Sequence, residues 1–109
     1  MRKLTEEERD LIVYLLEDKE GVEHIISELP DFFIEEMNDG GMGSLRFRSS
    51  KVSRLFGRQI AEISLLDEDM VPVSFAVFLD KDGDIYEFNV FKADFSPLKK
   101  FPIFPYSPL

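Results

Sequence analysis

The spacing of the apolar residues changes at Pro30, and this change constrains the fold more than any other feature of the sequence. Before Pro30 the apolar residues recur at intervals of three and four, which is the period of an amphipathic helix. Thr5 and Glu8 have the spacing of a capping box at a helix start. We therefore predict a helix over residues 5–17 and a shorter one that Pro30 ends. Their apolar faces consist of Leu11, Ile12, Leu15 and Leu16 in the first helix and Val22, Ile25, Ile26 and Leu29 in the second.

After Pro30 the apolar residues alternate with polar ones, as they do in strands that bury one face. Asp82 and Gly83 form a strong hairpin signal between the last two of these runs. Pro72 is tolerable because it lies near the start of its run. The sequence predicts strands over residues 32–38, 44–49, 58–66, 71–79 and 85–92.

Helices followed by a run of hairpin-connected strands indicate an α+β fold. We predict one domain over residues 1–109, in which two N-terminal helices pack on an antiparallel meander sheet of about five strands. Inward-facing apolar positions are expected in the last strand and in one or two helical turns over residues 50–57. They are Tyr86, Phe88 and Val90 in the strand and Val52, Leu55 and Phe56 in the helical turns.

The C-terminal residues 97–109 differ in composition from the rest of the chain. Four prolines exclude a helix or a central strand there and favour an extended conformation. The intervening residues are too apolar for a solvated tail, so we expect it to lie against the sheet or against a second chain. The prolines are Pro97, Pro102, Pro105 and Pro108, and the apolar residues are Phe101, Ile103, Phe104 and Tyr106.

The chain carries a net charge of −9 and has no cysteine. A negative charge of this size repels a phosphate backbone, so we do not expect nucleic-acid binding. Without cysteine there is no disulfide and no thiolate nucleophile or metal ligand. No apolar run approaches the roughly 20 residues that cross a membrane, and no signal-peptide pattern is present. We therefore expect a cytoplasmic protein that does not bind membranes.

Basic residues gather between Ser44 and Ile60, where no acidic residue occurs. This segment carries a charge of +5, and the remainder of the chain carries −14. The segment either docks beside the protein's own acidic helix and turns or forms a local face for an anion or a partner. The five basic residues are Arg46, Arg48, Lys51, Arg54 and Arg58.

A glycine-rich stretch, DGGMGS, separates the first two predicted strands. A phosphate-binding loop would need N–H groups that converge at a helix start, and here a strand follows. Asp39 would also repel a phosphate. We interpret the loop first as a turn and second as a contact loop, because Met42 is an apolar residue at its tip. The candidate contact residues are Gly40, Gly41, Met42 and Gly43.

A second candidate group comes from two predicted strands. Arg46 and Arg48 alternate with apolar residues and so point to the outer face, as Glu87 and Asn89 do on the last strand. A solvated polar face and a polar network or small-anion site both fit this arrangement. His24 is the only histidine, and the acidic turns do not have the spacing of a calcium loop. We predict no catalytic residue, cofactor or metal.

Three segments together resemble a small bacterial family of domains of unknown function. They are RKLTEEERDLI at 2–12, MNDGGMGSLRF at 37–47 and VPVSFAVFLDKDGDIYEFNVFKADFSPL at 71–98. The DGGMGS loop and the Asp-Gly hairpin that precedes KADFSPL carry the resemblance. It implies a stand-alone α+β domain with no assigned activity and no catalytic residues, and its single-domain members are similar to acidic immunity-type proteins.

Three functions fit these observations. The first is a non-catalytic binding protein, such as an immunity-like inhibitor, whose acidic surface meets a basic protein partner. The second is an enzyme or a small-anion binder with a site over the sheet. The third is a structural homodimer joined through the tail or an open sheet edge. We favour the first.

Overall fold

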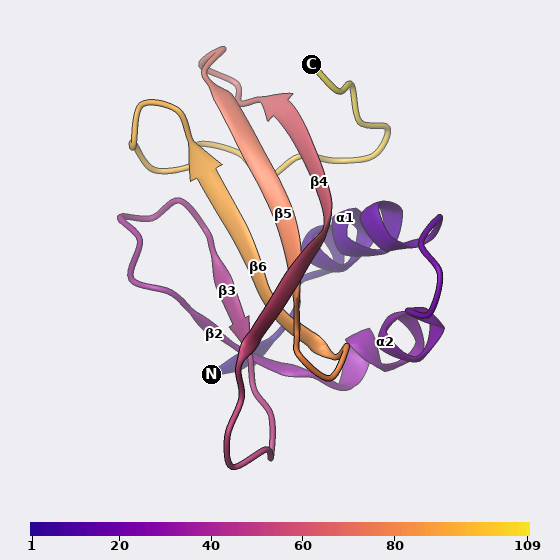
Figure 1. Ribbon diagram of the computed structural model, residues 1–109. Coiled ribbons are helices and arrows are strands. Elements are labelled where there is room, and N and C mark those ends of the chain that lie inside the picture. Colours follow the sequence, from indigo (N-terminus) through magenta and orange to yellow (C-terminus); the bar gives the residue numbers. More distant parts are fainter.

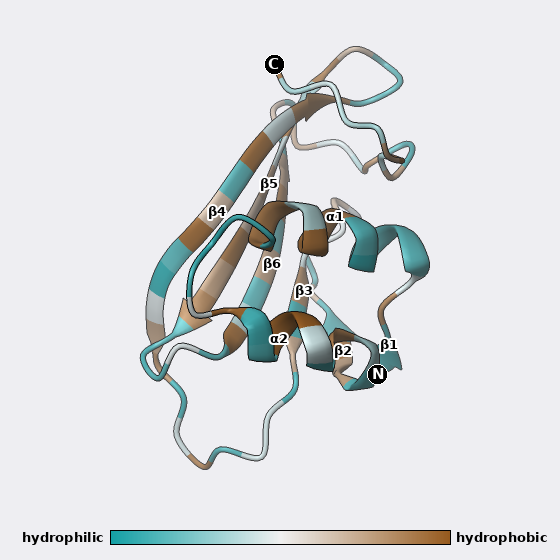
Figure 2. Cartoon of the chain, turned by 90° about the vertical axis from the view of Figure 1, so that its right-hand side faces the viewer, coloured by the Kyte–Doolittle hydropathy of each residue, from teal (hydrophilic) through white to brown (hydrophobic).

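The computed structural model describes residues 1–109 and places two α-helices on one face of a six-stranded antiparallel sheet (Figures 1 and 2). The predicted α+β class is confirmed. The helices are α1 (Glu6–Leu16), α2 (Glu23–Glu28) and the short 3-10 helix η1 (Leu29–Asp31). The strands are β1 (Arg2–Lys3), β2 (Phe33–Glu36), β3 (Leu45–Phe47), β4 (Phe56–Leu66), β5 (Pro72–Asp80) and β6 (Ile85–Lys92).

The strand order is β1-β2-β3-β6-β5-β4, so the sheet is not the simple meander of five strands that we predicted. Strand β6 lies between β3 and β5 and joins two three-stranded halves. The seam between β3 and β6 is short, with Leu45 opposite Phe88 and Arg46 opposite Glu87. The additional strand, β1, has only two residues, too few to show a period.

The start of α1 follows the predicted capping box. The Thr5 hydroxyl accepts the N–H of Glu8 at 3.1 Å, and the Glu8 carboxylate accepts the N–H of Thr5 at 2.9 Å. Glu8 also pairs with Arg2 at 2.8 Å, which ties β1 to the helix. Because the apolar face of α1 lies against the sheet, its four predicted core residues are buried. Helix α2 ends at Glu28, and Pro30 lies within η1.

The core lies between the inner face of the sheet and the helical layer (Figure 2). Strand β5 buries six of its nine residues, and Pro72 is its first residue. Phe75 and Phe88 stack in the centre at 6.1 Å between ring centroids. The buried residues of β5 are Val73, Phe75, Ala76, Val77, Leu79 and Asp80.

The helical turns predicted over residues 50–57 are wrong. Residues 48–55 form an irregular loop that protrudes between β3 and β4, and Phe56 and Gly57 already belong to β4 (Figure 1). Val52 is fully exposed, and Leu55 and Phe56 are more than half exposed. Lys51 and Arg54 both bind Asp80, and these ion pairs hold the loop in place of an apolar anchor.

The inward face of β6 also differs from the prediction at its first residues. Phe88 and Val90 are buried as expected, but Ile85 is buried in place of Tyr86. A register shift explains this, because Leu79 pairs with Ile85 whereas Phe78 pairs with Glu87. Such a bulge leaves one residue unpaired and reverses the alternation of side chains.

The C-terminal segment 97–109 has no helix or strand and crosses the inner face of the sheet (Figure 1). Leu98, Phe101 and Tyr106 are partly buried against the core, whereas Ile103 and Phe104 are exposed. The N–H of Leu109 donates to the carbonyl of Ser64 on β4 at 2.9 Å. The chain has no helix with the length and apolar character required to cross a membrane.

Candidate functional site

The glycine loop between β2 and β3 is organised by its own Asp39. The carboxylate accepts the N–H groups of Ser44 at 2.9 Å and Met42 at 3.2 Å. Burial opposes the charge on Asp39, but these hydrogen bonds outweigh it and lower its pKa. Gly40 and Gly41 have positive φ values of 76° and 83°, which only glycine adopts without strain. This carboxylate therefore occupies the N–H groups of Met42 and Ser44, and its negative charge opposes an anion in the loop.

The same loop packs against the protein's own chain. The carbonyl of Gly41 accepts the N–H of Leu98 at 3.1 Å, and a Cβ atom added at Gly41 would lie 3.2 Å from Pro97. Met42 is half-buried, and its sulfur accepts the N–H of Lys92 at 3.3 Å. The loop thus fixes the start of the C-terminal segment against β6. Met42 at the tip is thus partly occupied by contacts within the chain.

The structure brings Arg46 and Glu87 together across the β3–β6 seam. Their charged groups lie 2.7 Å apart, and Arg46 also lies over the ring of Tyr86. Arg48 pairs instead with Glu35 on β2. Asn89 lies two residues beyond Glu87, and its Oδ1 atom is buried without a hydrogen-bond partner. The four side chains predicted to share the outer face therefore form two separate ion pairs and an isolated amide.

Most of the basic segment between Ser44 and Ile60 is neutralised by acidic groups of the strands and turns. Lys51 lies 2.6 Å and Arg54 lies 2.9 Å from the buried carboxylate of Asp80. Burial opposes the charge on Asp80, but its bonds to Lys51 and Arg54 hold its pKa well below the usual range. Of the five basic residues only Arg58 has no ion pair. The segment is thus held by the protein's own acids, although by those of the strands and turns and not of the helix.

The helical layer has the opposite character. Residues 5–31 contain ten acidic and two basic residues, so they carry −8 of the total charge of −9. Glu8 is buried and paired with Arg2, but the other nine carboxylates are exposed. Among these nine, only Asp18 has an ion pair, with its neighbour Lys19 at 3.7 Å. We call these nine residues the acidic layer: Glu6, Glu7, Asp10, Glu17, Asp18, Glu20, Glu23, Glu28 and Asp31.

Sequence reasoning identified the total charge but missed this segregation. The charge of the basic segment was compared only with that of the remainder of the chain, in which the helices and the other strands were counted together. A charge count for each predicted element would have found the acidic layer, because the two N-terminal helices were predicted correctly.

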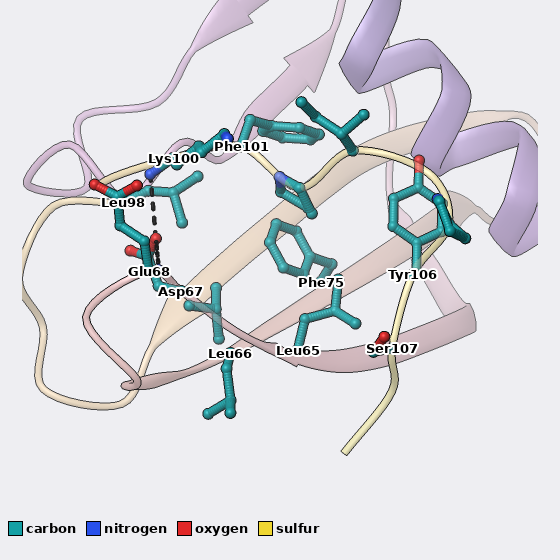
Figure 3. A pocket seen from close by; sticks show the side chains of 14 residues that line it. Leu65, Leu66, Asp67, Glu68, Phe75, Leu98, Lys100, Phe101, Tyr106 and Ser107 are labelled. Carbon is teal, nitrogen blue, oxygen red and sulfur yellow. Dashed lines mark hydrogen bonds between the residues drawn. The ribbon is translucent and has the colours of Figure 1, made fainter.

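A cavity of about 390 Å³ lies between the C-terminal segment and the ends of β4 and β5 (Figure 3). Leu65, Val73 and Phe75 form its apolar floor, and Phe101 and Tyr106 cover it. Its buried carboxylate, Asp67, accepts bonds from the ammonium group of Lys92 at 2.8 Å and the N–H of Lys99 at 2.7 Å. These bonds saturate Asp67, so the cavity offers mainly apolar contacts, with Glu68 and Lys100 as the other charged residues of its lining.

Lys92, Asp67 and Asp69 form a buried charged cluster beside this cavity, and Lys92 is its most unexpected member because lysine is rarely buried. Its side chain is fully buried and lies 2.8 Å from Asp67 and 2.7 Å from Asp69. The two acids belong to the turn between β4 and β5, at the opposite end of β5 from the Asp82-Gly83 turn (Figure 1). The cluster thus joins β6, this turn and the C-terminal segment.

A comparison with protein-family models gives one match, to a domain of unknown function named DUF6984, over residues 1–102. The chain belongs to this family. No significant match is found among curated proteins or solved structures. The DUF6984 match includes both helices, all six strands and the segment that Asp67 binds, but not Tyr106.

Tyr106, beyond the DUF6984 match, carries a buried hydroxyl group with no hydrogen-bond partner. Burial, together with the nearby charge of Asp10 and with Tyr14, raises its pKa. Tyr106→Phe removes this unsatisfied group and keeps the ring contact with Tyr14, whose centroid is 4.9 Å away. We expect the free energy of unfolding to rise by about 1 kcal/mol, measured by urea unfolding.

The matched control is Tyr14→Phe, because the hydroxyl group of Tyr14 is not a buried group without a partner. This variant should not gain stability. A loss of stability in Tyr106→Phe would show that the hydroxyl group has a partner in solution.

Proposed function

We propose that this DUF6984 protein is a non-catalytic protein-binding module that meets a basic partner through its acidic layer, as an immunity-like inhibitor would. The observation that carries the proposal is the distribution of ion pairs. Acidic residues of the sheet and its turns are largely paired with lysine or arginine, whereas eight of the nine carboxylates of the acidic layer have no ion pair.

This distribution makes one side of the molecule suited to a cationic surface. A partner that bound the paired acids would first have to displace their lysine and arginine partners. A partner that approaches the helical layer meets carboxylates without such competition, and their summed field increases its rate of association. Because exposed charges are screened by ions, the affinity should fall as the salt concentration rises.

The small-anion and enzyme alternative gains no comparable support. Arg46 and Arg48 are neutralised by Glu87 and Glu35, and Asp39 already accepts the N–H groups of Met42 and Ser44 in the glycine loop. An anion at either place would have to replace a carboxylate that is covalently part of the fold.

The proposal is tested by capturing proteins from the native host with the tagged protein at low and at high salt. We expect a basic partner to be retained in stoichiometric amount at low salt and lost at high salt. Glu20→Gln combined with Glu23→Gln should weaken its binding by about tenfold at low salt, because each exposed charge contributes up to about 1 kcal/mol.

The matched control is Glu68→Gln combined with Asp94→Asn, which removes the same charge from exposed positions outside the helical layer. It should leave binding nearly unchanged. Retention of no partner at low salt, or an equal loss of binding in both double variants, would contradict a role for the acidic layer.

A further inference from the structure

Strand β4 forms one edge of the sheet and has β5 as its only neighbouring strand. The N–H of Leu109 donates to the carbonyl of Ser64, so this carbonyl points away from β5. In an antiparallel strand the N–H and C=O of one residue point the same way, and the direction reverses at each residue. From Ala61 to Leu66 the pairing with β5 is regular, so the backbone groups of Glu62 and Leu66 also point to the free edge.

This edge therefore offers five backbone groups without a strand partner, namely both groups of Glu62, the N–H of Ser64 and both groups of Leu66. The contact of Leu109 shows that an extended chain can lie along the edge in hydrogen-bonding distance. That contact consists of one backbone hydrogen bond, and the side chain of Leu109 is largely exposed. A longer extended segment can replace it and form additional bonds along β4.

A groove with a cavity of about 280 Å³ runs between this edge and the C-terminal half of α1. Tyr14, Glu17 and Asp18 line it from the helix, and Ala61, Glu62 and Ile63 line it from the strand. Figure 1 shows α1 beside β4, with the C-terminus near the far end of the strand. A side chain that projects from an added strand toward the helical layer would enter this groove.

The charges around the groove favour a cation. The C-terminus of a helix carries a partial negative charge, and the last turn of α1 contains no basic residue to offset it. Glu17 and Asp18 are exposed at this end, and the one cation nearby, Lys19, is 3.7 Å from Asp18. The ring of Tyr14 adds an aromatic wall on which a lysine or arginine side chain can pack.

We propose that the basic partner binds as an added strand on the β4 edge at Glu62 and Ser64, with a lysine or arginine side chain in the groove beside Glu17 and Asp18. This inference rests on the proposed function and specifies its partner as an extended basic segment. A second copy of the chain fits the edge less well. If two β4 strands paired about a two-fold axis, both acidic α1 ends would lie on the same side of the joined sheet and repel each other.

The test uses a fluorescently labelled peptide of alternating lysine and valine, whose binding is measured by anisotropy. Two further peptides serve as probes: the same sequence with N-methyl groups on alternate backbone nitrogens, and a version with glutamate in place of lysine. N-methylation keeps the charge but removes N–H donors, so it separates strand addition from charge attraction. We expect the N-methylated peptide to bind at least about tenfold more weakly and the acidic peptide not to bind.

Two protein variants locate the site. Glu17→Gln combined with Asp18→Asn should weaken binding of the basic peptide by about tenfold. Glu68→Gln combined with Asp94→Asn makes the same change of charge at exposed positions outside the acidic layer and should have little effect. Amide hydrogen exchange provides a second measurement. The N–H groups of Glu62 and Ser64 should exchange more slowly when the unmodified peptide is bound.

Equal binding of the unmodified and N-methylated peptides, or unchanged exchange at Glu62 and Ser64, would overturn strand addition. The proposed function would still hold if the protein captured a basic host partner and the Glu20→Gln, Glu23→Gln double variant bound that partner more weakly. If no basic peptide bound and no partner were captured, both the inference and the proposed function would be wrong.

Discussion

Asp67→Ala is expected to lower the free energy of unfolding by about 3–5 kcal/mol, because it leaves the ammonium group of Lys92 buried without its main counterion. Both side chains are shielded from solvent, and their charged atoms lie 2.8 Å apart. Asp69 stays 2.7 Å from the ammonium group and keeps part of the compensation, which favours the lower end of this range. Urea unfolding of the variant and the unmodified protein measures the difference.

Asp67 also holds backbone groups that no other side chain reaches. It accepts the N–H groups of Glu68 and Lys99 at 2.7 Å and that of Lys100 at 3.1 Å. The truncation therefore frees the start of the C-terminal segment as well as the ammonium group. Asp69→Ala is the control. Because this carboxylate is partly exposed, its removal should lower the free energy of unfolding clearly less than Asp67→Ala does. Equal losses in the two variants would contradict the central role of Asp67.

A double variant separates the effect of the lone charge from that of the lost backbone contacts. Asp67→Ala combined with Lys92→Met leaves no unpaired charge in the core, so it should recover part of the stability lost by Asp67→Ala. A double variant that is less stable than the single one would indicate that the contacts of the Lys92 side chain matter more than its charge.

The pH dependence gives an independent check of the same pair. Burial opposes the charge on Asp67, but the bonds from Lys92 and the backbone outweigh it and lower its pKa from 3.8 to about 2. A carboxyl group whose pKa is lower in the folded state stabilises the fold above pH 3.8, and this contribution is lost as the pH falls toward 2. The unmodified protein should therefore lose more stability over this range than Asp67→Ala.

Gly57→Ala is expected to cost about 2–3 kcal/mol, because the added methyl group has no space. A Cβ atom at this position would lie 2.3 Å from the carbonyl oxygen of Asp80 and 2.6 Å from its carbonyl carbon. Both are backbone atoms of the paired strand β5, so the contact can be relieved only by moving β4 away from β5. That movement would also disturb the ion pairs of Asp80 with Lys51 and Arg54.

Gly40→Ala is the matched control for this prediction, and both variants are measured by urea unfolding. Gly40 has a φ of 76° but no atom within 4 Å of an added Cβ, so alanine there meets only conformational strain of about 1–2 kcal/mol. Gly57→Ala should therefore be the more destabilising change. The reverse order would mean that the start of β4 can move away from β5 at little cost.

The parts of the fold that depend on neighbouring residues could be predicted from the sequence. Thr5 and Glu8 interact over three residues, and this local contact is visible in the sequence as a capping box. The alternation of side chains in β5 likewise indicates a strand with one buried face. The position of β6 within the sheet could not be predicted, because its pairing with β3 joins residues far apart in the sequence, such as Leu45 and Phe88. Many other strand pairings fit the same sequence pattern.

The candidate residues were predicted less well than the fold, and the reason is tertiary charge pairing. Arg46 and Glu87 were grouped correctly because both point outward on strands that became neighbours. Arg48 and Asn89 were grouped by the same argument, but the position of β2 gives Arg48 a different partner. Lys92 looked like a polar residue at a strand end, and only the folded turn at Asp67 and Asp69 explains its burial.

The insertion of β6 between β3 and β5 sets the order in which the chain can fold during its synthesis. The helices and β1 to β3 leave the ribosome first, but β3 has no inner neighbour until Ile85–Lys92 has been made. Until then the apolar faces of α1 and α2 lack most of the sheet that covers them. The same early residues carry nearly all of the net negative charge. Nascent chains therefore repel one another until β6 has been synthesised. We therefore expect the acidic layer to serve the protein before folding as well as after it, by keeping an incomplete chain from aggregating.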